Sequence, residues 1–149
     1  MRLYLTISLL LTLVHTALAD TTNRAKQFSP VPGIFVGGVG LECKSKPPNI
    51  VEFLLLTKDR QRVGLAVFEN DDVTYDFLAI TRTTPRTYIL KQENIEFVLD
   101  RQSLKLTMDQ DYNCVVMSIS DLHDAAKDFL RTLLLSLIHI SEPTRQIVI

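Results

Sequence analysis

The chain of 149 residues has no tryptophan, only two cysteines and only three histidines. It also lacks the H-E-x-x-H pattern, the G-x-S-x-G pattern and the paired-cysteine spacing of zinc sites. Because 16 lysines and arginines face 17 aspartates and glutamates, the net charge is only -1. A chain this close to neutrality does not carry the basic surface that binds nucleic acid or an anionic membrane. We therefore expect no metal site, no cofactor, no nucleic-acid partner and no catalytic residue.

The N-terminal residues have the pattern of a secretory signal peptide. Arg2 precedes an apolar run over residues 3–14, and Ala17-Leu18-Ala19 is a small-residue cleavage site. The run is shorter than the ~20 apolar residues that a membrane-spanning helix needs. We predict that residues 1–19 are removed by cleavage between Ala19 and Asp20. The protein is then secreted or periplasmic, with no stable membrane span after cleavage.

Residues 135–145, LSLIHISEPTR, look like the in-frame translation of a transposase-type DNA sequencing adapter. The alternative is a natural tail that contains Glu142, Pro143 and Thr144. On the first interpretation residues 135–149 are an artefact, and the true C-terminus is missing. The same residues in a gene recovered from an independent library would contradict that interpretation.

Apolar and polar residues alternate over residues 95–117, which give the clearest structural signal in the chain. Its sequence is IEFVLDRQSLKLTMDQDYNCVVM, in which apolar residues recur at every second position between polar turns. A period of two predicts antiparallel strands with one buried and one wet face. The stretch therefore predicts a three-stranded meander.

Further strands are predicted upstream, at spacings near ten residues and with turn residues between them. The most apolar, residues 50–57, is expected to be buried on both faces. No long helical pattern interleaves with the strands, which argues against a parallel sheet. We predict a mainly β (α+β) fold, an antiparallel meander of about eight short strands closed as a small barrel or folded as a sandwich. The predicted upstream strands cover residues 39–43, 50–57, 62–68, 73–81 and 87–90.

The two cysteines, Cys43 and Cys114, both fall on the apolar parity of their strands. In an exported protein an even pair predicts a disulfide. On the chain-entropy model a bridge that closes a loop of roughly 70 residues contributes about 4 kcal/mol. The alternative is a free, reactive or metal-binding thiol, but no histidine lies near either cysteine in the sequence.

The period changes after residue 117. Apolar residues at helical spacing predict an amphipathic helix over residues 118–134, capped by Ser118 or Ser120 and packed on one mouth or face of the sheet. Residues 20–32 are polar and proline-containing. We expect a flexible lead-in over residues 20–38. The predicted organisation is thus a signal peptide (1–19), a lead-in (20–38), a β domain with a C-terminal helix (39–134) and the adapter-derived residues (135–149).

A group of acidic residues suggests a metal site but has a simpler structural explanation. Glu69, Asn70, Asp71 and Asp72, with Asp76, offer the oxygen ligands that calcium prefers, yet they lack the spacing of a calcium loop. We expect ordinary hairpin chemistry there.

Other candidates are weaker still. Residues 33–40 are rich in glycine, but the lysine that a phosphate-binding loop requires is absent. Close backbone packing is expected there instead. His123 is expected to be a surface or boundary residue at the start of the helix. Lys58, Arg60 and Arg62 are expected to form a solvated basic turn, and Asp100 is expected to pair with Arg101 or a neighbour.

Cys43 on the first strand, Leu99-Asp100-Arg101 near the last hairpin and Cys114 on the last strand resemble small secreted bacterial proteins, mostly of unknown activity. Those proteins pair an early and a late cysteine across a β-meander. The resemblance covers residues 39–117 and implies no functional residue. The chain also resembles the lipocalin barrel in export, β content and a late helix, but it lacks the G-x-W pattern of that family's first strand and is short.

The leading functional hypothesis is a non-catalytic secreted or periplasmic β domain that binds a protein or an envelope component. One alternative is a carrier whose sheet and helix enclose a small apolar ligand. A second alternative is an enzyme whose active residues lie in the missing C-terminal portion.

Overall fold

Short strands that alternate between two faces build the whole fold. The computed structural model describes residues 27–47 and 49–140; the predicted signal peptide, its cleavage site at Ala19 and Asp20, and residues 141–149 lie outside the described residues. The elements are η1 (Gly33–Phe35), β1 (Val39–Ser45), β2 (Val51–Leu56), β3 (Val63–Glu69), β4 (Asp72–Thr83), β5 (Thr87–Gln92), β6 (Ile95–Asp100), β7 (Lys105–Thr107), β8 (Asp111–Met117) and α1 (Ile119–Ile140).

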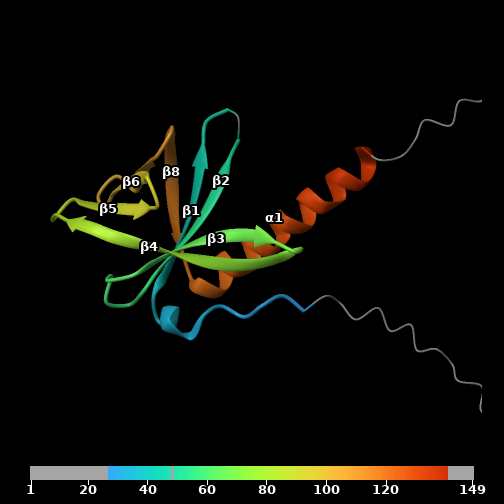
Figure 1. Ribbon diagram of the computed structural model, residues 1–149, viewed down its shortest axis with the longest axis horizontal. Helices are drawn as coiled ribbons and strands as arrows, with labels where there is room; N and C mark the ends of the chain where they lie inside the picture. The colour runs from blue at the N-terminus through green and yellow to red at the C-terminus, as the bar shows by residue number, and fades with distance from the viewer. Residues whose placement is uncertain (1–26, 48, 141–149) are drawn as a thin grey trace, which may run out of the picture.

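The strands form a closed antiparallel barrel in the order β1 to β8, and β8 pairs with β1 (Figure 1). The predicted fold class is confirmed. Of the two predicted architectures, barrel and sandwich, the pairing of β8 with β1 shows the barrel. Inward-facing side chains fill the barrel, as expected for a small eight-stranded barrel. This inner core consists of Leu41, Cys43, Leu54, Leu56, Val63, Leu78, Tyr88, Leu90, Phe97, Leu99, Leu106, Tyr112 and Cys114.

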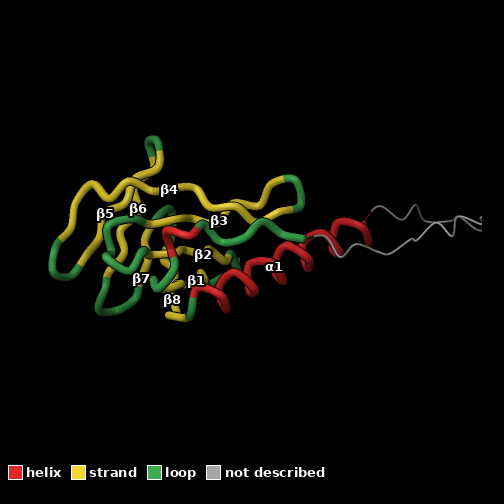
Figure 2. Tube along the Cα trace, turned by 90° about the horizontal axis from the view of Figure 1, so that it is seen from below, coloured by secondary structure: helices red, strands yellow, loops and turns green. Residues whose placement is uncertain are grey.

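A second core lies outside the barrel, beneath α1, which contacts β1, β2 and β4. Figure 2 shows the helix starting beside β1 and β8 and extending away beyond the barrel. Phe53 and Leu55 face this outer core, whereas Leu54 and Leu56 face the inner one, so β2 is buried on both faces as predicted. The helix approaches closely at Gly40, where an added Cβ would lie 2.7 Å from the Leu122 Cβ. The expected close backbone packing in the glycine-containing stretch is confirmed there.

Helix α1 begins where the sequence predicts. The Ser118 hydroxyl accepts a hydrogen bond from the Asp121 amide (3.1 Å) and donates one to the Asp121 carboxylate (2.7 Å). Ser118 is therefore the N-cap, and the pair resembles a capping box with Asp in place of Glu. The helix ends at Ile140, beyond the predicted end at residue 134. Residues 135–140, LSLIHI, contain neither proline nor glycine, so no residue there breaks the helix.

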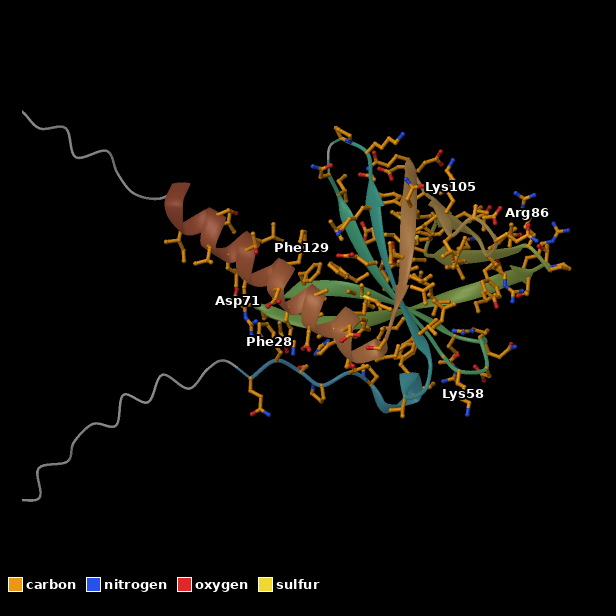
Figure 3. All side chains as sticks on the ribbon, turned by 180° about the vertical axis from the view of Figure 1, so that it is seen from behind. Phe28, Lys58, Asp71, Arg86, Lys105 and Phe129 are labelled. Atoms are coloured by element: carbon orange, nitrogen blue, oxygen red, sulfur yellow. A yellow bond between two sulfur atoms is a disulfide. The ribbon has the colours of Figure 1, made fainter. Side chains whose placement is uncertain are left out.

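The described part of the lead-in, residues 27–38, packs against the barrel through a few apolar side chains. Phe35 is fully buried in the outer core, and Phe28 and Val31 pack against that core. The Ser29 amide also donates a hydrogen bond to Asp72 (2.9 Å) in the β3–β4 hairpin. The polar composition of the segment concealed these few apolar anchors. In Figure 3, Phe28, Asp71 and Phe129 lie at the helix side of the molecule, away from Arg86.

Cys43 and Cys114 lie directly opposite each other on β1 and β8, with their sulfurs 2.06 Å apart. The Cys114 amide donates to the Leu104 carbonyl on the β7 side, so the two cysteines form a non-hydrogen-bonded pair in the β1–β8 ladder. Side chains approach most closely in such pairs. The pair is at disulfide distance, as predicted, which is compatible with an oxidising compartment.

Within residues 27–47 and 49–140, no helix combines the length and the apolar character that crossing a bilayer requires.

Candidate binding site at the barrel ends

One end of the barrel forms a cavity of about 390 Å³ that combines apolar side chains with carboxylates. We call it the acidic mouth. On β2, residues 52, 54 and 56 share a face, and this alternation points Glu52 inward at the end of the strand, opposite Cys43 in the β1–β2 register. The acidic mouth is lined by Ile50, Glu52, Leu65, Ile95, Phe97, Met108, Asp109 and Tyr112.

The acidic mouth holds apolar side chains in contact with water. Ile95 is 58% exposed and Ile50 is 37% exposed, while Phe97 forms part of the buried floor. The Tyr112 hydroxyl accepts a hydrogen bond from Gln110 Nε2 (3.2 Å) and donates one to Asp109 (3.4 Å). These bonds hold the phenol and one carboxylate at the rim.

The carboxylates of the acidic mouth repel each other. Burial, and then the charge of Asp109, raises the pKa of Glu52 above its ordinary value. Burial also raises the pKa of Tyr112, with contributions from Asp109 and Glu52. A cation placed between Glu52 and Asp109 would relieve this repulsion. The acidic mouth therefore favours a ligand with a positive charge flanked by apolar groups.

The raised pKa of Glu52 predicts a pH-dependent effect on stability. A carboxyl group whose pKa is higher in the folded state favours folding when protonated, and this contribution is lost as the pH rises through the folded pKa. We expect Glu52→Gln to raise the melting temperature at pH 7, with the gain disappearing below about pH 4, where both states are protonated. Thermal unfolding from pH 3 to 8 measures this. Glu96→Gln, on the exposed surface of β6, is the control, and an equal gain at all pH values for Glu52→Gln would contradict the prediction.

His123 is buried, which differs from the sequence-based prediction. We predicted a surface or boundary residue, but its side chain is only 8% exposed and Nδ1 lies 2.9 Å from the Tyr75 hydroxyl. Burial and the nearby Lys127 lower the pKa of His123, and burial raises the pKa of Tyr75. Neutral His123 and neutral Tyr75 thus satisfy each other beneath α1. The prediction failed because the lead-in and β4 cover a helix face that the sequence alone leaves open.

Asn70 and Asp71 form the β3–β4 hairpin turn, as expected, whereas Asp72 and Asp76 bond to other segments. Asn70 and Asp71 have positive φ values of 52° and 56°, which match the two-residue type I′ turn. Asp72 accepts from Ser29, and Asp76 accepts from Gln92 (3.3 Å) on β5. Across the described ranges, no three His, Cys, Asp or Glu side chains lie together in a way that could hold a metal ion.

The basic β2–β3 turn is solvated at Lys58 and Arg62 but not at Arg60. Arg60 is partly buried, and its Nη1 atom is inaccessible to water. A surface hollow of about 560 Å³ lies beside this turn. Asp59, which lines it, already accepts from Thr57 (2.6 Å) and the Gln61 amide (3.0 Å), and these bonds lower the pKa of Asp59.

Asp100 pairs with a neighbour, one of the two predicted outcomes. Its carboxylate accepts from Arg86 Nε (2.8 Å) and from the Gln102 and Ser103 amides (2.9 and 3.0 Å). These bonds, led by that from Ser103, hold the pKa of Asp100 well below its ordinary value. Arg101 is left to stack over the Tyr88 ring, with its guanidinium carbon 4.6 Å from the centroid.

The fold is that of an up-and-down β-barrel with a filled interior, an external helix and a cavity at its end. No protein-family model, no curated protein and no solved structure matches the chain.

Sequence reasoning missed Glu52 and Arg60 as site residues. Glu52 is the one charged residue within an otherwise apolar strand, and that interruption was an available signal. The sequence did not show whether the Glu52 side chain points into or out of the barrel, because both faces of β2 are apolar. Arg60 carries no sequence signal that separates it from Lys58 and Arg62.

Proposed function

We propose that the protein is a non-catalytic, secreted or periplasmic binding domain that recognises a partner protein through the acidic mouth. The observation that carries the proposal is the combination of exposed Ile95 and Ile50 with the Glu52 and Asp109 carboxylates around one cavity. A basic side chain flanked by apolar residues complements this surface in both charge and hydrophobicity. The predicted export signal supports the compartment, and so does the cysteine pair.

The filled interior supports recognition at the surface rather than an enclosed carrier. Inward-facing side chains such as Leu54, Leu90 and Leu106 have no exposed area, and side chains of the outer core occupy the space under α1. The assignment as a non-enzyme stays a prediction. A turnover activity that a single point substitution abolishes would overturn it.

A capture experiment with a matched control tests the proposal. Ile95→Lys places a positive charge in the acidic mouth, whereas Val115→Lys makes the same kind of change on the outer face of β8, where Val115 is 60% exposed. Immobilised wild-type and variant proteins are incubated with envelope or secreted proteins of the source organism, and retained proteins are quantified by mass spectrometry.

We expect one protein to be retained by wild type and by Val115→Lys, and to be reduced at least tenfold on Ile95→Lys. Such a loss corresponds to about 1.4 kcal/mol of binding free energy. Equal retention by all three proteins would contradict recognition through the acidic mouth. Circular dichroism of both variants checks that each remains folded.

A further inference from the structure

The barrel end opposite the acidic mouth holds a second cavity, of about 210 Å³, with two arginines at its rim. We call it the arginine mouth. Its walls are apolar and include Leu41, Leu56, Leu99 and Leu104, and among the described lining residues only Arg60 and Arg101 are charged. The β2–β3 loop carries Arg60, and the β6–β7 turn carries Arg101. In Figure 3, Lys58 and Arg86, which neighbour these two regions, lie on the side of the molecule away from α1.

Arg60 lines this cavity, and one donor atom of its guanidinium has no hydrogen-bond acceptor. Nη1 has no accessible surface and no hydrogen-bond partner among the described residues. A buried donor on a charged group is costly to leave unsatisfied, and native structures pair such groups with an acceptor. The backbone of Arg60 also has a φ of 59°, a left-handed conformation that favours glycine over arginine. Both costs are offset if a ligand supplies the missing acceptor.

Arg101 contributes a second cationic group beside the same cavity. Its guanidinium lies over the Tyr88 ring, and Nη1 lies 3.5 Å from the Thr84 carbonyl, a long hydrogen bond. The stacking orients the planar group and leaves donors available. The nearest acid in the sequence, Asp100, is occupied by Arg86 and the turn amides. No carboxylate lines the arginine mouth among the described residues.

We propose that the arginine mouth binds a small organic carboxylate with a short aliphatic tail. Guanidinium groups bind carboxylates through paired, charge-assisted hydrogen bonds. Arg60 already lines the cavity, and a rotation of its side chain toward the ligand would give the buried Nη1 atom its acceptor. The leucine walls would cover the tail. The cavity lies below the roughly 300–1,000 Å³ typical of drug-sized ligands, so the site suits a short acid rather than a long-chain lipid.

Octanoate is the probe, and the protein is purified with its disulfide formed from an exporting host. Isothermal titration calorimetry measures binding of octanoate, of octanol, which has the tail without the charge, and of acetate, which has the charge without the tail. We expect octanoate to bind with a dissociation constant below about 1 mM and at least tenfold more tightly than either fragment.

Two variants test the arginines separately. Arg60→Gly removes the guanidinium while suiting the left-handed turn, so the fold is retained. Arg101→Gln removes the second cation, and Lys91→Gln is the control, because it removes the same charge from an exposed position on β5. We expect octanoate affinity to fall at least tenfold in Arg60→Gly and in Arg101→Gln, and to stay within twofold of wild type in Lys91→Gln.

Three results would overturn the proposal. They are the absence of saturation below about 1 mM octanoate, equal affinity for octanol, and unchanged affinity in both arginine variants. Binding of octanoate with perturbed amide resonances at Ile95 and Met108 instead of Leu99 and Leu104 would place it at the acidic mouth and would equally contradict it. The proposal does not depend on the acidic mouth or its partner.

Discussion

Replacing both Cys43 and Cys114 with alanine is expected to lower the free energy of unfolding by about 4 kcal/mol. The disulfide joins cysteines with a sequence separation of 71 residues. On the entropic model a loop of this size removes conformational entropy from the unfolded chain and raises its free energy by about 4 kcal/mol. The bridge joins β1 to β8, the pairing that closes the barrel. Loss of the bridge therefore weakens closure itself. Urea denaturation of wild type and double variant measures the difference.

Reduction provides the control for this substitution. Wild type in a strong reductant should lose a similar free energy, whereas the alanine variant should not respond to reductant. A loss below about 1 kcal/mol in the double variant would show that the chain constraint contributes little to stability. A loss in the variant without any effect of reductant on wild type would point instead to packing of the two buried side chains.

Replacing Phe35 with alanine is expected to cost about 3–5 kcal/mol, the range for a fully buried aromatic side chain. The Phe35 ring has no exposed area, and its centroid lies 5.7 Å from that of Phe77 in a stacked arrangement. It also covers Gly64, where an added Cβ would lie 2.7 Å from the ring. The substitution opens a cavity in the outer core and loosens the lead-in from the barrel. Denaturation midpoints and slopes measure the loss.

The neighbouring residue gives a matched control. Val36 follows Phe35 in the chain but is 77% exposed, so Val36→Ala should change the free energy of unfolding by less than about 0.5 kcal/mol. If Phe35→Ala changed stability as little as Val36→Ala, the packed lead-in would be contradicted. Residues 27–38 would then behave as the flexible segment that their composition suggests.

Local pattern was sufficient for most of the secondary structure. Alternation predicted the meander of β6, β7 and β8, and the change of period predicted the start of α1. The cysteine pair was predicted because only two cysteines exist and both fall on the apolar parity. The sequence narrowed the helix cap to Ser118 or Ser120, and the structure shows that it is Ser118. All these features depend on residues close in sequence or on a choice among very few partners.

Site residues were less predictable because they depend on contacts between distant segments. Arg60 looked like its neighbours Lys58 and Arg62, and only the barrel end turns its guanidinium inward. His123 was expected at the surface or its boundary, but it is buried against Tyr75, which lies 48 residues away in the sequence. Phe35 lay in a segment too short and too irregular to show a period. In each case the partner that decides burial is far away in the chain.

The sequence by itself determined which residues share a face of each strand, where the helix begins and which cysteines can pair. The physical reason is that side-chain period and residue count are local properties. Only the tertiary structure decided that the sheet closes as a barrel and that Glu52 faces inward beside Cys43. Only it placed the carboxylates of the acidic mouth and the guanidinium groups of the arginine mouth at opposite ends. Closure sets these positions, because it joins the last strand to the first and assigns one face of every strand to the interior.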